Sequence, residues 1–345
     1  MVNEVEMREE GSEEISAAET AVYDRQIRLW GIEAQNKLRH SRVRVVGLRG
    51  LGAEVVKNLM LCGLKELQLV DNDPVTADDC FSSFFLSQAD VGKARDSATL
   101  PGAAALNPLV QLSIGEESIE GLDLVILCDQ PYEKVEKTNI ECRSRGIRFI
   151  SSSVFGWVGY AFFDFNKHFF LLKKEKPAPL VGIDGGADVV VDEKNVTTIE
   201  EEQFEKKALV YPSFSETLNV DWQSKKLIRK ARLLLPASYF SVRAMLRLEE
   251  KEELKGEDEA DVASLSAAYK KELEACNQSD QPESIYSKKL DYFFGPQLSP
   301  SAAVVGGFIG QESIKALTEG KSPLRNLFLY SALDSTAHIC NFPPK

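Results

Sequence analysis

The sequence has few of the side chains that bind metals or form disulfides. Its 345 residues include three His and six Cys. No two cysteines have CxxC spacing and the histidines lie far from one another, which argues against a zinc site. Scattered cysteines without such a pattern are typical of the reducing cytosol or nucleus. The cysteines are Cys62, Cys80, Cys128, Cys142, Cys276 and Cys340, and the histidines are His40, His168 and His338.

Long apolar runs and basic leader segments are also absent. No apolar run approaches the roughly 18 residues that a bilayer-spanning helix needs. The N-terminal segment is rich in Glu and lacks the basic and apolar parts of a secretory signal. The net charge is −12, from 41 basic and 53 acidic residues, which argues against general nucleic-acid binding and against adhesion to anionic membranes. We therefore expect neither nucleic acid nor membrane as a partner.

The first half of the chain has the alternating pattern of an α/β sheet. A strand at 42–47, a glycine turn at 47–52, a helix at 53–62 and a strand at 66–70 that ends at Asp71 form the first unit of a nucleotide-binding sheet. Further strands at 110–114, 122–127 and 147–151, with a helix at 132–144, predict a doubly wound, mostly parallel, Rossmann-like α/β fold.

The later part of the chain predicts an inserted region of mixed β and helical structure. After residue 153, aromatic residues alternate as in antiparallel strands, and helical periodicity follows after a charged segment. The predicted segments are an acidic disordered tail at 1–18, the nucleotide-binding half at 19–153, an aromatic β segment at 154–173, a flexible charged loop at 174–207, a mainly helical region at 208–298, and a return to the main fold at 299–345. The last segment is expected to begin as an apolar run broken by Pro and Gly, to end as a helix near residue 318, and to supply a last strand at 327–329.

The glycine turn has the pattern G-x-x-G-x-G, with Gly47, Gly50 and Gly52. Glycines let the backbone approach phosphates closely, and the start of the following helix favours negative charge. Asp71 lies about 20 residues further on, where an acceptor for ribose hydroxyls belongs. By itself this predicts a nucleotide fold without specifying the cofactor; the alternative is a turn needed only for helix–strand packing.

Three segments together resemble a known family. Residues 23–31 (YDRQIRLWG), 47–54 (GLRGLGAE) and 299–315 (SPSAAVVGGFIGQESIK), in this order and spacing, resemble the adenylation domains of ubiquitin-like-protein activating enzymes. The resemblance covers about residues 19–335. Within the family, the chain is most similar to small subunits of SUMO-activating enzymes, which pair with a larger catalytic subunit. The similarity lies in the chain length, in the loop after residue 173 and in the sequence of residues 23–31.

The resemblance implies a chemistry and a role for one arginine. In the family, the C-terminal carboxylate of a modifier attacks the α-phosphate of ATP–Mg to give an acyl-adenylate, and a cysteine of the catalytic subunit then takes the acyl group as a thioester. An arginine near the N-terminus reaches ATP in the partner's site, and here it matches Arg25. A planar, permanently charged guanidinium suits phosphate oxygens. The alternatives are an ion pair between Arg25 and Asp24 within the helix, and Arg28 as the phosphate contact.

The family's own ATP-binding pattern fails at several positions of this chain. Asp71-Asn72-Asp73 keeps the two acids of a D-x-D motif. The Asn and Arg that should contact ATP fall on about Asp79 and Ser82, which places negative charge beside a triphosphate.

Three other family positions also differ. The family's Lys falls near Arg95, with Lys93 out of register, and its Mg-linked Asp falls near Gln130, with Asp129 displaced by one. The third loop position, usually Gly, is Arg49. We therefore predict a degenerate pocket that binds no cofactor or metal of its own, with Asp71 hydrogen-bonded to the empty loop. ATP and Mg would belong to the partner's site, and the chain would be inactive alone.

The remaining candidates have plain structural interpretations. Cys276 lacks a basic or helix-N-terminal setting and is not expected to be a thioester nucleophile, and Cys62 and Cys128 are expected to be buried. Trp30 and the apolar run 302–309 belong either to the core or to a subunit interface. Gln311 and Glu312 are expected to cap the start of the last long helix.

The sequence is compatible with several function classes. The favoured one is the non-thioester subunit of a heterodimer that activates SUMO, with nuclear residence implied by the resemblance. A small subunit serving another ubiquitin-like modifier and a self-sufficient homodimeric enzyme of the sulfur-carrier type are the alternatives. A dehydrogenase would need the motif G-x-G-x-x-G and a catalytic His or Tyr pair, and neither is evident in the sequence. A purely scaffolding protein is a further alternative, and the segment around Arg25 argues against it.

Overall fold

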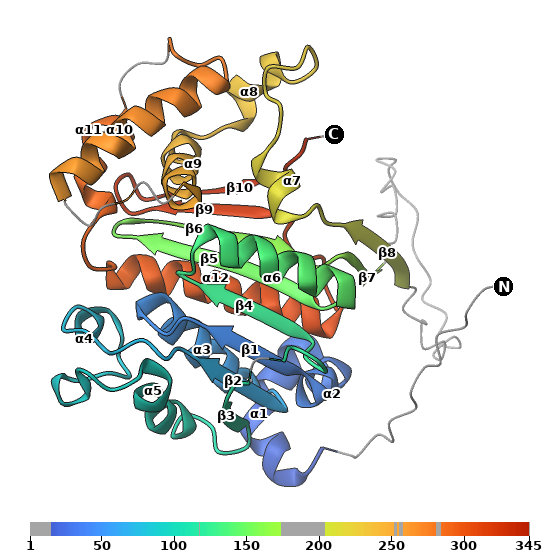
Figure 1. Cartoon of the computed structure of the whole chain (residues 1–345). Helices are drawn as coiled ribbons and strands as arrows, with labels where there is room; N and C mark the ends of the chain where they lie inside the picture. Colours follow the sequence, from blue (N-terminus) through green and yellow to red (C-terminus); the bar gives the residue numbers. More distant parts are fainter. Residues whose placement is uncertain are drawn as a thin grey trace, which may run out of the picture.

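The computed structural model describes residues 15–116, 118–173, 204–251, 254, 258–280 and 284–344. Within these residues the main sheet has the strand order β10-β9-β6-β5-β4-β1-β2-β3 (Figure 1). Strands β3, β2, β1, β4 and β5 are parallel, and β6, β9 and β10 continue the sheet antiparallel. The strands are β1 (Arg42–Val46), β2 (Glu66–Val70), β3 (Gln111–Ile114), β4 (Leu124–Cys128), β5 (Arg148–Phe155), β6 (Val158–Asp164), β9 (Leu327–Ser331) and β10 (Thr336–Cys340).

Helices cover both faces of this sheet. Along β4, Leu124 and Ile126 pack with α3 (Gly50–Cys62) and α12 (Ser299–Thr318) on one face. The alternate residues Val125 and Leu127 pack with α6 (Tyr132–Arg145) and α9 (Ala237–Glu250) on the other. A strand buried on both faces reads as a continuous apolar run, as 124–128 does. The predicted doubly wound α/β fold is confirmed.

Helices α1 (Ala17–Trp30) and α2 (Ile32–His40) lead into the amino end of β1. A capping box between Ser16 and Glu19 starts α1, so the helix begins two residues inside the segment predicted as a tail. Residues 1–14 of that predicted tail lie outside the described residues. Because α2 ends just before β1 and the glycine turn follows β1, the two helices and the turn lie at opposite ends of that strand (Figure 1).

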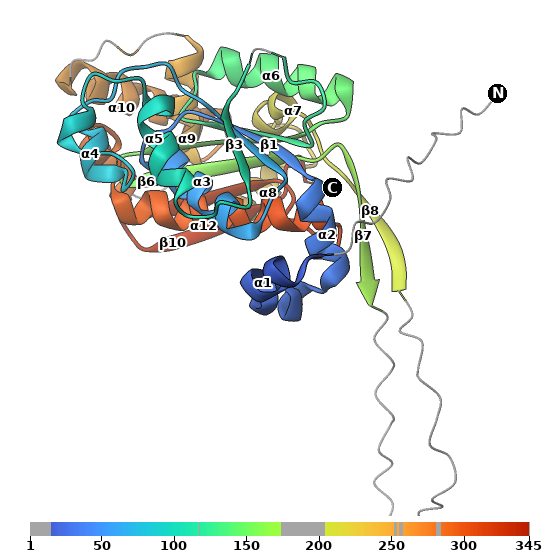
Figure 2. The same ribbon diagram turned by 90° about the horizontal axis from the view of Figure 1, so that it is seen from below.

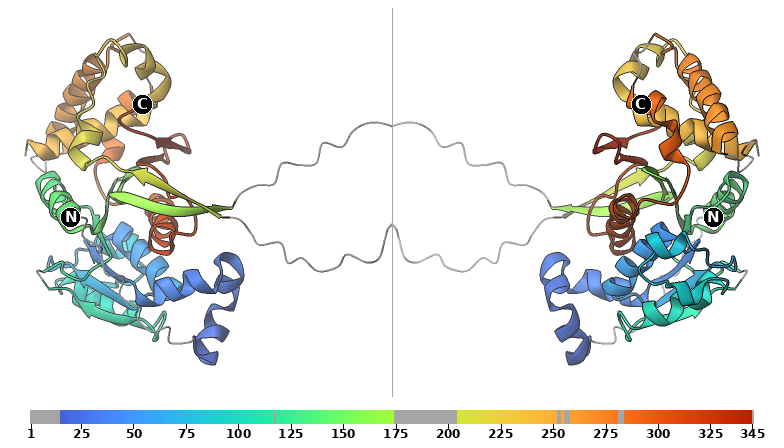
Figure 3. Two further views of the ribbon diagram at one scale, coloured as in Figure 1. Left: turned by 90° about the vertical axis from the view of Figure 1, so that its right-hand side faces the viewer. Right: turned by 90° about the vertical axis from the view of Figure 1, so that its left-hand side faces the viewer.

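A two-stranded ribbon projects from the body of the molecule. It consists of β7 (Lys167–Lys173) and β8 (Phe204–Val210) in antiparallel register (Figures 2 and 3). Residues 204–207 are therefore strand rather than part of the predicted loop, and the rest of that predicted loop, 174–203, lies outside the described residues. The aromatic β segment expected at 154–173 corresponds to the end of β5 followed by β6 and β7.

The described part of the region between β8 and α12 is mainly helical, with turns between the helices. Its elements are α7 (Phe214–Leu218), α8 (Ile228–Leu234), α9, α10 (Asp258–Ala275), α11 (Ile285–Lys288) and η2 (Leu290–Phe293). The earlier crossover between β2 and β3 holds α4 (Asp79–Ser82), η1 (Gln88–Asp90) and α5 (Arg95–Ala104). None of the helices described is long and apolar enough to cross a bilayer.

The segment expected to begin as a Pro- and Gly-broken run is one continuous helix, α12. Its glycines allow close packing on α3, because a Cβ on Gly306 would lie 2.6 Å from the Glu54 Cβ, and one on Gly310 would lie 2.7 Å from the Asn58 Cβ. The capping prediction for Gln311 and Glu312 is wrong, since both lie in the second half of α12. The last strand was expected at 327–329, but β9 is longer and β10 follows it at the sheet edge.

Candidate functional site

The glycine turn lies at the carboxyl end of β1, beside the carboxyl end of β4. Gly47 has φ +88°, and a Cβ there would lie 2.0 Å from the carbonyl oxygen of Cys128. Gly50 and Gly52 already belong to the first turn of α3, so the turn is shorter than predicted. A Cβ on Gly52 would lie 1.9 Å from the Gly47 carbonyl oxygen. Gly47 and Gly52 are thus required for packing within the turn and against β4, whether or not a nucleotide binds.

Asp71 holds this turn in place. Its Oδ2 accepts a hydrogen bond from the Leu48 backbone N–H at 2.7 Å, and its Oδ1 accepts one from the Asp73 N–H at 3.2 Å. Arg95 Nη1 lies 3.4 Å from the same carboxylate. Burial raises the pKa of Asp71, and the Leu48 N–H and Arg95 act in the opposite direction. The carboxylate is therefore engaged by the chain's own backbone at the position where a ribose acceptor was considered.

A buried ion pair fills the space next to the turn. Arg95 Nε lies 2.8 Å from Asp79 Oδ2, with side-chain exposures of 9% and 1%. Burial opposes ionisation of Asp79, but bonds from the Thr76 N–H and from Arg95 outweigh it and lower the pKa of Asp79. Arg49 Nε lies 3.4 Å from the other Asp79 oxygen. Asp79, whose negative charge was predicted to repel a triphosphate, thus pairs with both nearby guanidinium groups, those of Arg49 and Arg95.

Gln297 and Ser82 cover the start of α3. Gln297 Oε1 accepts a hydrogen bond from the Leu51 N–H at 3.1 Å, and its Nε2 donates to the Val154 carbonyl at 3.2 Å. A Cβ on Gly50 would lie 2.7 Å from the Ser82 Cβ. Free N–H groups at a helix start are what bind phosphate, and here a side-chain oxygen takes one of them. The residues present do not fit a bound triphosphate.

Sequence reasoning missed Gln297. It lies 246 residues from Leu51 along the chain, in a segment without a nucleotide-binding motif. Only the tertiary fold brings it to the glycine turn.

The remaining candidate residues at this edge are engaged locally. Asp129 Oδ1 accepts from the Val154 N–H at 3.0 Å, and burial raises the pKa of Asp129. Gln130 donates to the Cys128 carbonyl at 3.0 Å. Lys93 is exposed and pairs with Asp90 at 2.8 Å. The residues that the structure describes include no group of three His, Cys, Asp or Glu side chains placed to hold a metal ion.

Arg25 lies far from this turn. It is exposed on α1, and among the described residues it makes no hydrogen bond or ion pair. Within the helix, Asp24 pairs with Arg28 at 3.1 Å, so the ion pair considered between Arg25 and Asp24 is not formed. Helix α1 packs at the C-terminal end of α3, where Gln26 Nε2 donates to the Leu61 carbonyl at 2.8 Å. The glycine turn lies at the other end of α3, about 18 Å away at 1.5 Å per residue, so Arg25 does not serve its own turn.

Exposed apolar side chains lie on the same helix as Arg25 and at the start of the next one. Val22, Leu29 and Ile32 are 62%, 70% and 54% exposed. Leu29 and Trp30 also line a cavity of about 610 Å³ between α1, α2, α3 and α12. An exposed apolar patch of this kind is typical of a protein–protein contact.

The run 302–309 and Trp30 differ in how deeply they are buried. Within the run, Ala302, Val305 and Ile309 are fully buried in the chain's own core. Trp30 is only half-buried, and its Nε1 donates to Gln35 Oε1 at 3.2 Å. The core interpretation therefore holds for these three residues, whereas Ala303 and Val304 are exposed. Trp30 lies at the cavity beside Leu29.

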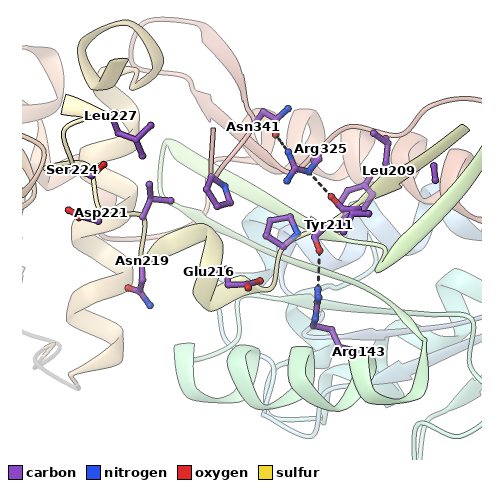
Figure 4. Close-up of a pocket in the computed structure, with 15 residues that line it drawn as sticks. Arg143, Leu209, Tyr211, Glu216, Asn219, Asp221, Ser224, Leu227, Arg325 and Asn341 are labelled. Carbon is purple, nitrogen blue, oxygen red and sulfur yellow. Dashed lines mark hydrogen bonds between the residues drawn. The ribbon is translucent and has the colours of Figure 1, made fainter. Parts of the chain in front are cut away.

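A larger cavity of about 860 Å³ lies elsewhere, between β8, α7 and the C-terminal segment (Figure 4). Its two guanidinium groups are bound to main-chain carbonyls: Arg143 donates to Tyr211 at 3.3 Å, and Arg325 donates to Val210 at 2.8 Å. The glycine turn does not line this cavity.

Cys276 does not provide a reactive thiol. Cys276 is 2% exposed, and burial raises its pKa to about 12. A thiol with such a pKa stays protonated at neutral pH and is a poor nucleophile. Cys62 and Cys128 are buried as predicted.

Comparisons with known proteins place this geometry in a family. The ThiF family matches residues 23–345. The SUMO-activating enzyme subunit aos-1 of Caenorhabditis elegans is 42% identical over 96% of this chain and 99% of its own length. The human SUMO-activating enzyme subunit 1 is 34% identical over 98% of this chain and 99% of its length.

Solved structures share the fold at low sequence identity. Escherichia coli MccB with MccA-N7isoASN has a TM-score of 0.55 at 13% identity, covering 96% of this chain and 73% of that one. PaaA has a TM-score of 0.54 at 14% identity, covering 97% of this chain and 76% of that one. At this identity the similarity shows the fold alone.

Proposed function

Because the chain belongs to the ThiF family, and because nearly full-length relatives are named as subunits of SUMO-activating enzymes, we propose that it is the small, non-thioester subunit of a heterodimeric SUMO-activating enzyme. Its partners are then the catalytic, thioester-forming subunit and a SUMO-type modifier. The chain supports adenylation of the modifier's C-terminus in the partner's active site and is inactive alone.

The observation that carries this proposal is the separation of two features that an independent enzyme would combine. The glycine turn is covered by Gln297 and by the Asp79–Arg95 pair. Arg25 is exposed at the far end of α3 within an apolar surface. A permanently charged group on such a surface suits a contact with phosphate on another subunit.

In this proposal ATP and Mg²⁺ belong to the partner's site. ATP supplies the activated phosphate for adenylation of the modifier, and this chain adds a cation that stabilises negative charge developing on the phosphates. The apolar surface around Arg25 excludes water when it meets the partner, which strengthens that electrostatic contribution.

The test compares two arginines on the same helix. The chain is mixed with the catalytic subunit, SUMO and ATP–Mg, and pyrophosphate exchange and the SUMO thioester are measured. We expect Arg25→Ala to lower exchange by about 10²-fold or more, as for other phosphate-contacting arginines, with subunit association nearly unchanged. The matched control is Arg28→Ala, one turn further along α1, which removes only an exposed ion pair with Asp24.

Two results would contradict the proposal. Unchanged exchange in Arg25→Ala would remove the role given to this residue. Pyrophosphate exchange by the isolated chain would show a working pocket and would favour the homodimeric sulfur-carrier alternative. The alternative of a subunit for another ubiquitin-like modifier is distinguished by offering the heterodimer each modifier in turn.

The nucleus is the proposed location, since the family resemblance implies it. A fluorescent fusion of the full chain, expressed with and without the catalytic subunit, tests this directly. Exclusion of both forms from the nucleus would contradict it.

A further inference from the structure

One part of this acidic protein carries charge of the opposite sign. Residues 222–248 contain no Asp or Glu, whereas the whole chain has a net charge of −12. The cations of this stretch are Lys225, Lys226, Arg229, Lys230, Arg232, Arg243 and Arg247. The first five lie in α8 or in the turn before it, and all five are exposed.

Three of these cations are not neutralised by the described part of the chain. Arg232 pairs with Asp280. Lys225, Lys226 and Arg229 form no ion pair with any residue that the structure describes. Unpaired cations that lie close together on an exposed helix raise the local positive potential and attract negatively charged groups.

Exposed leucines adjoin these cations. Leu233 is 86% exposed and lies one turn after Arg229, on the same side of α8. Leu234 is 39% exposed, whereas the fully buried Ala231 anchors the helix to the core. We call Lys225, Lys226, Arg229, Leu233 and Leu234 the α8 surface.

The α8 surface continues into the larger cavity of Figure 4. Ser224 and Leu227, which bracket the two lysines, both line that cavity (Figure 4). Its apolar lining includes Leu209, Pro212, Val220, Leu227 and Pro343.

The carboxylates of this cavity are already engaged. Glu216 accepts from the Ser213 N–H at 2.8 Å and from its hydroxyl at 3.0 Å. Asp221 accepts from the Gln223 N–H at 3.1 Å. The acids of the cavity are thus engaged by their own chain, whereas Lys225 and Lys226, which follow Ser224 in the sequence, form no ion pair with the described residues.

We propose that the α8 surface and the adjoining cavity form a docking site for a short acidic segment of another protein that also carries apolar side chains. The carboxylates of such a segment lie against Lys225, Lys226 and Arg229, and its apolar side chains contact Leu233 and the cavity. This combination of charge and exposed leucine fits a peptide better than a nucleic acid. A longer polyanion would run beyond the α8 surface onto a chain whose overall charge is negative.

The experiment measures binding of a fluorescein-labelled peptide of Glu and Leu to the full chain by fluorescence anisotropy. The triple variant Lys225→Glu, Lys226→Glu, Arg229→Glu should weaken binding about tenfold or more. Leu233→Ser should weaken binding a few-fold without altering its salt dependence. Raising the salt concentration should weaken wild-type binding, because exposed charges are screened.

A matched control changes the same net charge elsewhere. Lys65→Glu, Lys137→Glu, Lys270→Glu also replaces three exposed cations, and it should bind the peptide within about twofold of wild type. The milder triple Gln variant of the α8 cations should give an intermediate loss. Thermal melts of each variant establish that the fold is retained, since every substituted side chain is exposed.

Three results would overturn the proposal. Equal loss of binding in the α8 triple and the control triple would reduce the effect to overall charge. Equal binding of a Lys and Leu peptide would remove the charge complementarity. Tighter binding of a single-stranded oligonucleotide than of the acidic peptide would assign the α8 surface to nucleic acid. None of these outcomes depends on the role of Arg25.

Discussion

At the scale of single residues, Asp79 pairs with two guanidinium groups beside the glycine turn, those of Arg49 and Arg95. A buried pair such as Asp79–Arg95 contributes little net stability, because the cost of removing both charges from water offsets their attraction. The pair matters for binding instead. Because the Arg95 guanidinium is bound to Asp79, it is not available to a phosphate. The sign of the charge at position 79 was readable from the sequence, but the place of Gln297 was not.

His168 makes the stability of the chain depend on pH. It is 3% exposed, and its Nε2 has no partner among the described residues. Burial, with Arg148 acting in the same direction, lowers its pKa from 6.5 to about 4. The folded state therefore keeps His168 neutral where the unfolded chain takes up a proton. Its contribution is complete above pH 6.5 and is lost as the pH falls toward 4, by about 2 kcal/mol at pH 5.

Urea unfolding at pH 7 and pH 5 measures this contribution. His168→Phe, which places a ring near Phe165, should lose about 2 kcal/mol less than wild type between the two pH values. His338→Phe is the control, since His338 is exposed on β10, and it should follow wild type. An equal loss in wild type and in His168→Phe would show that His168 is not the titrating group.

At the scale of elements, the position of α1 depends on Gly63, the residue that follows α3. Gly63 has φ +80°, and a Cβ there would lie 2.6 Å from Cζ of the buried Tyr23. Asn107 Nδ2 donates to the Tyr23 hydroxyl and to the Met60 carbonyl, both at 2.8 Å. These contacts fix α1, and so the direction of Arg25, on the C-terminal end of α3.

Gly63→Ala should therefore release α1 from α3. We expect faster amide exchange within Ala17–Trp30 and, in the reconstituted heterodimer, a loss of adenylation that approaches that of Arg25→Ala. Gly146→Ala is the control: Gly146 also ends a helix in the left-handed conformation, at φ +70°, but no atom lies within 4 Å of its added Cβ. That control should cost about 1–2 kcal/mol from backbone strain alone.

Comparison of the two variants separates strain from displacement. If Gly63→Ala and Gly146→Ala left amide exchange in α1 equally slow, the contact with Tyr23 would not control that helix.

Elements of the main sheet were predictable where local pattern and tertiary role agree. The apolar run 124–128 is buried on both faces, and its pattern predicts a central parallel strand. Helix α12 was harder, because Gly306 and Gly310 read as turn residues until their contacts with Glu54 and Asn58 are known. Strand β10 has three exposed residues in succession, so its sequence lacks the alternation that identifies a strand.

At the scale of the whole molecule, the two ends of α3 have different surroundings. One end meets Gln297 and the Asp79–Arg95 pair and is closed by the chain itself. The other carries α1, with Arg25 among exposed apolar side chains. The sequence motifs could predict each feature by itself, the degenerate glycine turn and the functional arginine. Their separation across about 18 Å follows only from the helix that joins them.

Association with the catalytic subunit should depend on the apolar surface around Arg25. Leu29 is 70% exposed and lines the cavity between α1 and α12. A charge placed there must be desolvated when the surfaces meet, so Leu29→Asp should weaken heterodimer formation at least about tenfold, measured by titration calorimetry. The unfolding free energy of the isolated chain should change by less than about 0.5 kcal/mol, as for other surface substitutions.

The control for this prediction is Ile339→Asp, which alters an equally exposed apolar residue at 63% on the edge strand β10. Strand β10 ends the sheet on the side opposite β3 (Figure 1), so this variant should bind the catalytic subunit like wild type. Equal weakening by both variants would mean that any exposed charge disturbs the complex. Normal association of Leu29→Asp would place the contact elsewhere, and Arg25 could then not be carried to the partner's phosphates by this face of α1.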